Sequence, residues 1–348
     1  MSTSLYSTNI LKIIMKNKNF WQKLKLTKRP FFCIAPMADV TDAPFRKMFS
    51  KYGKPDVMWT EMVSCDGLMH EEKAEQKPRG SKYPARDRLA LSFIYDESER
   101  PIVAQIFGGD PETFRETAKY VRELGFDGID INMGCPDHGI NKQNAGANLI
   151  KSPKLAQEII KATKEGAGDI PVSVKTRIGF NKNEIDTWIP AILSAKPAAL
   201  TIHGRTRKEM SKVSAHWDEV AKCVELAKDT DTVIIGNGDV KSLEEGRKRR
   251  DESGVDGIMV GRGIFGNPWF FNEKIKKSDL PLSEILKVML EHARLFEELL
   301  GGKKPFVLMR KHFGSYVGGF PGASELRAKL MTTECADEVE KVIKNFEL

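Results

Sequence analysis

Short apolar runs alternate with longer amphipathic stretches along most of the chain. The runs are four to six residues long and almost continuously apolar, which is typical of buried parallel strands. The predicted strands are Phe31–Ala35, Val57–Thr60, Ile102–Phe107, Gly128–Met133, Val172–Arg177, Ala199–His203, Val233–Gly236 and Gly257–Val260. Eight strand–helix units between residues 31 and 276 predict an α/β fold. At that length they favour a closed (β/α)8 barrel, a TIM barrel, over an open doubly wound sheet.

Helix boundaries are predicted from capping residues and prolines. Asp110-Pro111 opens a helix that ends at Gly125, and Ser152-Pro153 opens another. Thr41 or Asp42 is expected to cap a helix that runs to Gly53. Further helices are expected near residues 183–195, 217–228, 242–252 and 268–275. A charged insertion at residues 64–100 is expected to hold a helix near 68–77 and a strand near Leu89–Tyr95.

The pattern changes at about Ser278, where the strands stop. Leu282–Leu300 is a strongly amphipathic helix, and the chain from Ser324 onward is expected to be helical as well. We therefore expect a basic N-terminal extension at residues 1–30, a barrel domain at 31–277 and a helical domain at 278–348.

Composition is that of a soluble globular protein, 41% hydrophobic and 30% charged. We expect no membrane span, because no run of 18 apolar residues occurs, and a cytoplasmic location, because no signal-peptide pattern is present. We also expect a monomer. Residues 1–30 contain seven Lys and Arg residues and no Asp or Glu, which leaves 48 basic against 48 acidic residues elsewhere. The formal charge of +7 is thus weak evidence for a polyanionic partner. This leader is more typical of a solvated extension than of an RNA-binding arm.

The five cysteines are scattered, without metal-ligand spacing, so we expect no metal site and no disulfide framework. Cys135 differs from the others in its setting. The strand Gly128–Met133 breaks at Gly134-Cys135-Pro136, which places this thiol on a loop just past a strand end. From this pattern alone, a cysteine packed as a small apolar residue and a catalytic thiol are both open.

Polar side chains gather at the carboxyl ends of successive strands, where barrel enzymes have their active sites. Period-2 alternation predicts that these side chains point inward. They are Gln105, Asp130, Asn132, Ser173, Lys175, Arg177, Thr201 and His203. A lysine that points into a barrel is costly unless it is paired or contacts a ligand, so either Asp130 or a bound group is its expected partner.

Glycine turns follow the last two strands, at Gly236–Asp239 and at Gly261–Gly263, and Arg262 adds a positive charge. Backbone amides of such turns bind phosphate in many barrels. Together with Gln105 and Lys175, the turns indicate a planar, phosphorylated cofactor, and flavin mononucleotide (FMN) fits this description.

From about Phe20 to Leu330 the chain resembles a known family, the tRNA-dihydrouridine synthases. The resemblance is carried by APMADVTDAPFR (35–46), AQIFGGDP (104–111), INMGCP (131–136), AGANL (145–149), VKTRIG (174–179), TIHGRT (201–206), IGNGDV (235–240), GRGIFGNPW (261–269) and MRKH with GGFPGASELR (309–327). The combination is specific, although each piece alone is not.

The resemblance implies an FMN-dependent enzyme that uses NADPH to reduce particular uridines of tRNA, with Cys135 as the proton donor. It implies a flavin site made by Pro36, Met37, Ala38, Gln105, Lys175, His203, Asn237, Gly238, Asp239, Gly261 and Arg262. It also implies that Asn132 contacts the target uracil and that Arg177 and Arg205 contact RNA. Basic residues of the C-terminal part can form a further RNA-binding face, namely Arg310, Lys311, His312, Arg327 and Lys329.

One departure from the family pattern is Asp137-His138-Gly139, where the family usually carries basic residues. Three alternatives remain open. One is an FMN barrel that acts on a small molecule, as dihydroorotate dehydrogenases or ene-reductases do. The second is a non-catalytic tRNA-binding barrel. The third is a flavin-free lyase that uses Lys175 for a Schiff base.

Overall fold

The computed structural model describes residues 18–69 and 85–346. These residues form an eight-stranded sheet in the order β1-β8-β7-β6-β5-β4-β3-β2, and a parallel bridge between Cys33 and Val57 joins its two edges. The strands are β1 (Phe31–Ile34), β2 (Met58–Ser64), β3 (Ile102–Phe107), β4 (Gly128–Met133), β5 (Val172–Arg177), β6 (Ala199–His203), β7 (Val233–Asn237) and β8 (Gly257–Val260). The predicted (β/α)8 barrel is therefore confirmed.

The chain divides into two compact units. Among the described residues, the first unit comprises 18–31, 107–237 and 247–258. The second comprises 32–69, 85–106, 238–246 and 259–346.

The helices follow the strands as the capping signals predict. They are α2 (Phe20–Leu26), α3 (Ala43–Tyr52), α4 (Cys65–Met69), α6 (Ala85–Ala90), α7 (Pro111–Glu123), α8 (His138–Lys142), α9 (Pro153–Ala167), α10 (Ile185–Ser194), α11 (Trp217–Ala227), α12 (Leu243–Ser253), α13 (Leu282–Leu300), α14 (Arg310–Tyr316), α15 (Ala323–Leu330) and α16 (Ala336–Lys344). Asp42 and Asp110 cap α3 and α7 through their side chains. None of the helices in the described residues is both long and apolar enough to cross a membrane.

Two sequence-based predictions of secondary structure were wrong. The strand expected at Leu89–Tyr95 is instead the end of α6 and a 3₁₀ turn at Leu91–Phe93. Leu91 and Ile94 pack there against the hydrophobic core of the C-terminal helices. The helix expected near 268–275 is a series of turns. Three consecutive aromatic residues there, 269–271, are all buried, which no single helix face could achieve, and Asn272 accepts two backbone amides. The helix expected near 68–77 lies largely outside the described residues.

Part of the basic leader is packed. In the first unit, Trp21 of α2 is fully buried and stacks near Phe31, and Lys25 pairs with Asp256 at 3.2 Å. The leader between residues 20 and 26 is therefore part of the folded unit rather than a solvated extension.

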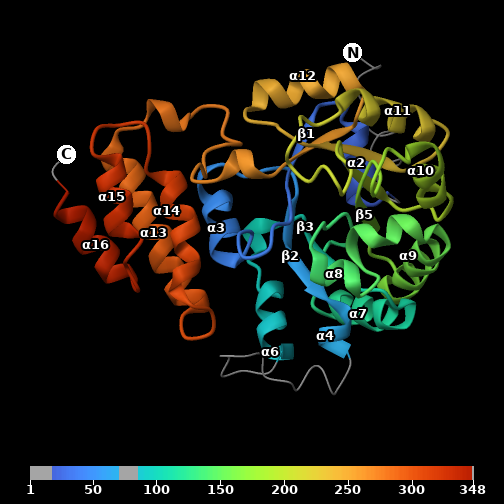
Figure 1. Cartoon of the computed structure of the whole chain (residues 1–348), viewed down its shortest axis with the longest axis horizontal. Coiled ribbons are helices and arrows are strands. Elements are labelled where there is room, and N and C mark those ends of the chain that lie inside the picture. Colours follow the sequence, from blue (N-terminus) through green and yellow to red (C-terminus); the bar gives the residue numbers. More distant parts are fainter. Residues whose placement is uncertain (1–17, 70–84, 347–348) are drawn as a thin grey trace, which may run out of the picture. The chain divides into compact units, whose positions relative to one another are not determined.

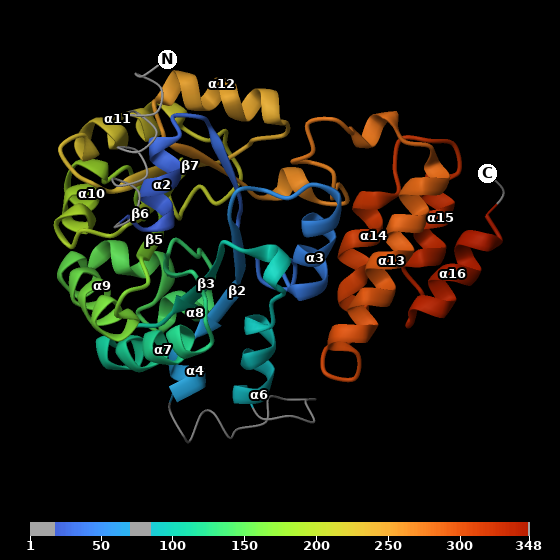
Figure 2. The same cartoon turned by 180° about the vertical axis from the view of Figure 1, so that it is seen from behind.

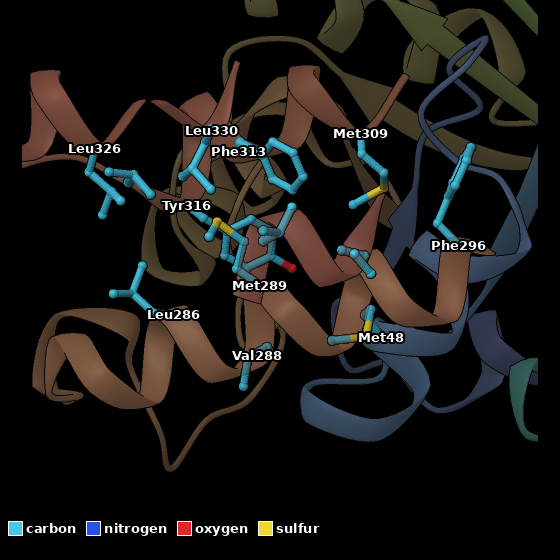
Figure 3. Packing of buried hydrophobic residues seen from close by; sticks show 14 of the residues in the cluster. Met48, Leu286, Val288, Met289, Phe296, Met309, Phe313, Tyr316, Leu326 and Leu330 are labelled. Carbon is cyan, nitrogen blue, oxygen red and sulfur yellow. The ribbon is translucent and has the colours of Figure 1, made fainter. Parts of the chain in front are cut away.

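The C-terminal helices share one hydrophobic core within the second unit. Helices α13 to α16 lie side by side in both views (Figure 1, Figure 2). Their buried side chains pack with Met48 of α3 (Figure 3) and also with Trp269. Within the described chain, no strand follows residue 278, as the sequence predicted.

Candidate active site

The strand register of the first unit places the predicted polar residues on one face. Lys175 on β5 lies opposite Asn132 on β4 and Thr201 on β6. His203 on β6 lies opposite Arg177 on one side and Asn237 on the other. Since paired residues of parallel strands point to the same face, these six side chains form one polar face at the carboxyl ends of β4 to β7. The alternation predicted from sequence is thus consistent with the register.

Lys175 is half-buried on this face. Burial, together with the nearby guanidinium of Arg177, lowers the pKa of Lys175 to about 8, while Asp130 acts in the opposite direction. Asp130 itself accepts a hydrogen bond from Ser173 Oγ at 2.6 Å. The hydroxyl of Thr201 is buried and has no hydrogen-bond partner among the described residues. A cation and an unsatisfied hydroxyl on adjacent strands suit a bound group that carries hydrogen-bond acceptors.

The loop that carries Cys135, residues 134–147, is held by hydrogen bonds at several points. Asn132 Oδ1 accepts the backbone amides of Gly134 at 3.0 Å and of Cys135 at 2.9 Å. The carbonyl of Cys135 accepts the amide of Ala147 and the side chain of Asn141, both at 3.0 Å. The position of the thiol is therefore determined by the backbone on both sides of it.

The Cys135 side chain is half-buried. Burial raises the pKa of the Cys135 thiol above its usual range, although the Asp137 amide and the charges of Arg177 and Lys175 oppose this. The thiol is therefore protonated at neutral pH. A thiol in this state is suited to donate a proton and is poorly suited to act as a nucleophile.

The unusual Asp137-His138-Gly139 segment has a structural explanation. Asp137 is the N-cap of α8, and its side chain accepts the amide of Ile140 at 3.0 Å. His138 is exposed. The acidic residue therefore stabilises the turn that follows the cysteine.

Arg177 and Arg205 are buried, with 6% and 2% of their surfaces exposed. Arg177 donates to the carbonyls of Gly134, Thr206 and Met210. Arg205 donates to the Val213 carbonyl at 2.6 Å and lies 3.1 Å from His203 Nε2. Because a guanidinium only donates, Nε2 of His203 accepts, and its ring proton lies on Nδ1. Both arginines thus support loops, and their contact with RNA stays a prediction.

The remaining predicted site residues belong to the second unit. Pro36 and Met37 are half-buried in the loop after β1, Ala38 is exposed, and Gln105 on β3 is fully buried. Thr41 Oγ1 closes this loop by accepting the amide of Met37 at 3.0 Å.

Within the second unit, the chain that follows Gly238 approaches the turn at Gly261–Gly263. A Cβ on Gly263 would lie 2.3 Å from the Val240 carbonyl, so the close approach requires glycine. Gly238 has φ 137° and Asp239 has φ 55°, and Asp239 pairs with Arg262 at 3.5 Å. Gly261 lies beside Met37, because a Cβ there would be 3.8 Å from its sulfur. The geometry is compatible with the predicted phosphate-binding turns.

The basic face expected in the C-terminal part is smaller than predicted. His312 is 3% exposed and lies in an aromatic cluster, so it cannot belong to this face. Arg310 and Arg327 are half-buried and donate to the backbone carbonyls of Thr333 and Val317. Lys311 and Lys329 remain exposed.

Several residues that hold the site were missed at the sequence level. Asn141 and Gly146 support the cysteine loop, and Glu209 organises the loop after β6 by accepting the Thr206 amide at 2.8 Å. Their partners lie in irregular loops, where no periodic pattern marks them.

Comparison with known proteins finds relatives along most of the chain. A family model described as dihydrouridine synthase matches residues 33–347. A probable tRNA-dihydrouridine synthase 2 of Bacillus subtilis (strain 168) is 41% identical over 334 residues, covering 95% of this chain and 97% of the relative. A probable tRNA-dihydrouridine synthase of Staphylococcus aureus (strain MRSA252) is 40% identical, covering 95% of this chain and 96% of the relative.

Two solved structures are similar at low sequence identity. Histamine dehydrogenase from Rhizobium sp. 4-9 has a TM-score of 0.51 at 13% identity and covers 76% of this chain and 48% of its own. Morphinone reductase has a TM-score of 0.47 at 11% identity and covers 69% and 84%. The similarity to histamine dehydrogenase concerns the fold alone.

Proposed function

The chain belongs to the dihydrouridine synthase family, and on this premise we propose that it reduces the 5,6 double bond of specific uridines in tRNA. We propose FMN as its cofactor, NADPH as the reductant and the cytoplasm as its location. The single observation that carries the proposal is the half-buried Cys135 thiol, held by backbone hydrogen bonds at the end of β4.

Saturating a carbon–carbon double bond requires a hydride at one carbon and a proton at its neighbour. Bound FMN, once reduced, would supply the hydride. Cys135 Sγ would supply the proton, since its thiol keeps the proton at neutral pH. Asn132 would contribute by fixing the amides of residues 134 and 135, and so the position of the thiol.

The residues present fit a flavin. Lys175 and the unsatisfied hydroxyl of Thr201 would bind acceptor atoms of the ring or ribityl chain, with Gln105, His203 and Asn237 as further polar contacts. Gly238, Asp239, Gly261 and Arg262 would hold the phosphate. The backbone of Pro36, Met37 and Ala38 would lie along the ring.

The substrate base is part of folded tRNA, so it must be turned out of its stack to reach Cys135. Lys311 and Lys329 are exposed cations that would contribute to the attraction of tRNA by the segment 278–348.

The cofactor proposal is tested by FMN titration with fluorescence detection. The wild type is expected to bind FMN and to show flavin absorption bands, and Lys175→Met is expected to bind it at least about tenfold more weakly. Lys277→Met is the matched control. Burial lowers the pKa of Lys277 to about 8 as well, but its ammonium donates to the carbonyls of Ser315 and Tyr316. A wild-type protein that is colourless and takes up no FMN would contradict the proposal.

A further inference from the structure

We infer that Lys304, in the turn that follows α13, is a positioning residue that holds the loop after β1 (residues 35–41, the β1 loop) through the carboxylate of Glu61. The inference rests on the proposed function in one respect, because the β1 loop carries Pro36, Met37 and Ala38 of the proposed flavin site. All residues involved lie in the second unit.

The β1 loop needs an external restraint at Asp39. This residue has φ 55°, a left-handed conformation that is unfavourable for a residue with a side chain. Its backbone amide donates to Glu61 Oε1 at 2.6 Å. Glu61 therefore stabilises the loop at its strained position, directly after Ala38.

Glu61 is itself buried, with 4% of its surface exposed. A buried carboxylate is unfavourable unless a cation or several donors compensate it. Lys304 Nζ contacts Glu61 Oε2 at 2.7 Å, and Ser92 Oγ donates weakly to the same oxygen at 3.4 Å. Only 11% of the Lys304 side chain is exposed, so this ion pair is shielded from solvent.

The other buried cation near the β1 loop has its own partners. Arg46 is fully buried and donates to the Glu99 carboxylate and to the carbonyls of Thr41 and Ile94. It restrains the far end of the loop, at Thr41. Among the described residues, the direct ion pair of Glu61 is therefore the one with Lys304.

The backbone of Lys304 is hydrogen-bonded to the end of α13. Its backbone amide donates to the carbonyl of Leu300, the last residue of α13, at 2.8 Å. Leu300 is fully buried in the helical core, which also includes Met48 of α3, the helix that begins just after the β1 loop (Figure 3). The helical segment therefore reaches Glu61, which holds the β1 loop, through the charge of Lys304, and it packs against α3, which follows that loop. This arrangement makes the segment part of the support for the proposed flavin site.

A second cation of the same segment provides a matched control. Lys311 Nζ contacts Asp39 Oδ2 at 3.4 Å, but half of each side chain is exposed. Exposed ion pairs of this kind contribute little. Lys304 and Lys311 thus approach the same loop from the same segment, one buried and one exposed.

The test measures amide hydrogen exchange of the peptide that contains residues 36–41, in full-length protein without FMN. Lys304→Met is expected to accelerate exchange of this peptide by about tenfold or more relative to both wild type and Lys311→Met. Lys304→Arg is expected to keep exchange slow. In Glu61→Gln/Lys304→Met, exchange is expected to return toward the wild-type rate, because a glutamine oxygen still accepts the Asp39 amide and leaves no buried charge. This double variant also keeps the inference falsifiable if Lys304→Met alone folds poorly.

Titration with FMN is the second measurement. Lys304→Met is expected to bind FMN at least about tenfold more weakly than Lys311→Met. Equal exchange rates at residues 36–41 in Lys304→Met and Lys311→Met would overturn the inference, as would a double variant no slower than Lys304→Met. A wild type that takes up no FMN, while its loop exchange still depends on Lys304, would overturn the proposed function and support the role of Lys304 in holding the loop.

Discussion

Arg177 Nε donates to the carbonyl oxygen of Gly134 at 2.7 Å, and so β5 directly supports the residue that precedes Cys135. The same guanidinium reaches the carbonyls of Thr206 and Met210 in the loop after β6. One buried cation thus connects the ends of three strands. Its positive charge also acts on the thiol, whose pKa it lowers against the larger effect of burial.

Replacing Arg177 with Met removes this charge. We expect the pKa of Cys135 to rise further, because one of the charges that oppose the effect of burial is removed. The measurement is the pH dependence of Cys135 alkylation by iodoacetamide, resolved by peptide mass spectrometry. Arg177→Lys keeps the charge while losing the forked hydrogen bonds, and should shift the pKa less. A thiol pKa that falls in Arg177→Met would show that this account of the electrostatics is incorrect.

Gly146 makes the cysteine loop possible at its closing turn. It has φ 61°, and a Cβ there would lie 3.0 Å from the Cys135 carbonyl oxygen. We expect Gly146→Ala to displace Cys135 and to slow uridine reduction by about tenfold or more. Gly319→Ala is the control, since Gly319 has φ 82° but nothing within 4 Å of the added methyl. Both variants should lose about 1 kcal/mol of unfolding free energy to backbone strain. Equal reduction rates in the two variants would rule out the displacement.

A buried histidine pair in the helical core predicts acid sensitivity. The rings of His292 and His312 are 4.8 Å apart, and His292 Nε2 has no hydrogen-bond partner among the described residues. Burial lowers the pKa of His312 to about 4 and, with the nearby His312, lowers that of His292 well below its usual value. Both are neutral in the folded protein, whereas the unfolded chain binds protons below about pH 6.5. The contribution of the histidine pair to the free energy of unfolding therefore decreases as the pH falls from 6.5 toward 4.

We expect His312→Phe to reduce this pH dependence by about 3 kcal/mol between pH 7 and pH 4, as measured by urea unfolding at each pH. His138→Phe is the control, because His138 is exposed. A pH dependence that is the same in His312→Phe and wild type would refute the assignment.

The sequence predicts the barrel well because each strand is a contiguous apolar run and each helix begins at a local cap. It also predicts which residues of β4 to β6 point inward, since alternation alone decides this. The partners of those residues are not local. Arg177 was expected to contact RNA, yet it binds carbonyls 29 to 43 positions away in the chain. Glu61 and Lys304 are 243 positions apart, and no pattern connects them. His312 was expected on a basic face, but the packing of α13 and α14 buries it.

The central claim is that this chain reduces tRNA uridine with Cys135 as the proton donor. The most direct test incubates unmodified tRNA with the protein, FMN and NADPH, and maps dihydrouridine by mass spectrometry. Wild type is expected to form dihydrouridine. Cys135→Ala is expected to retain FMN but to lose at least about 100-fold in rate, while Cys335→Ala, which changes another half-buried cysteine, is expected to react like wild type. A wild type that forms no dihydrouridine, or a Cys135→Ala variant as fast as Cys335→Ala, would contradict the claim.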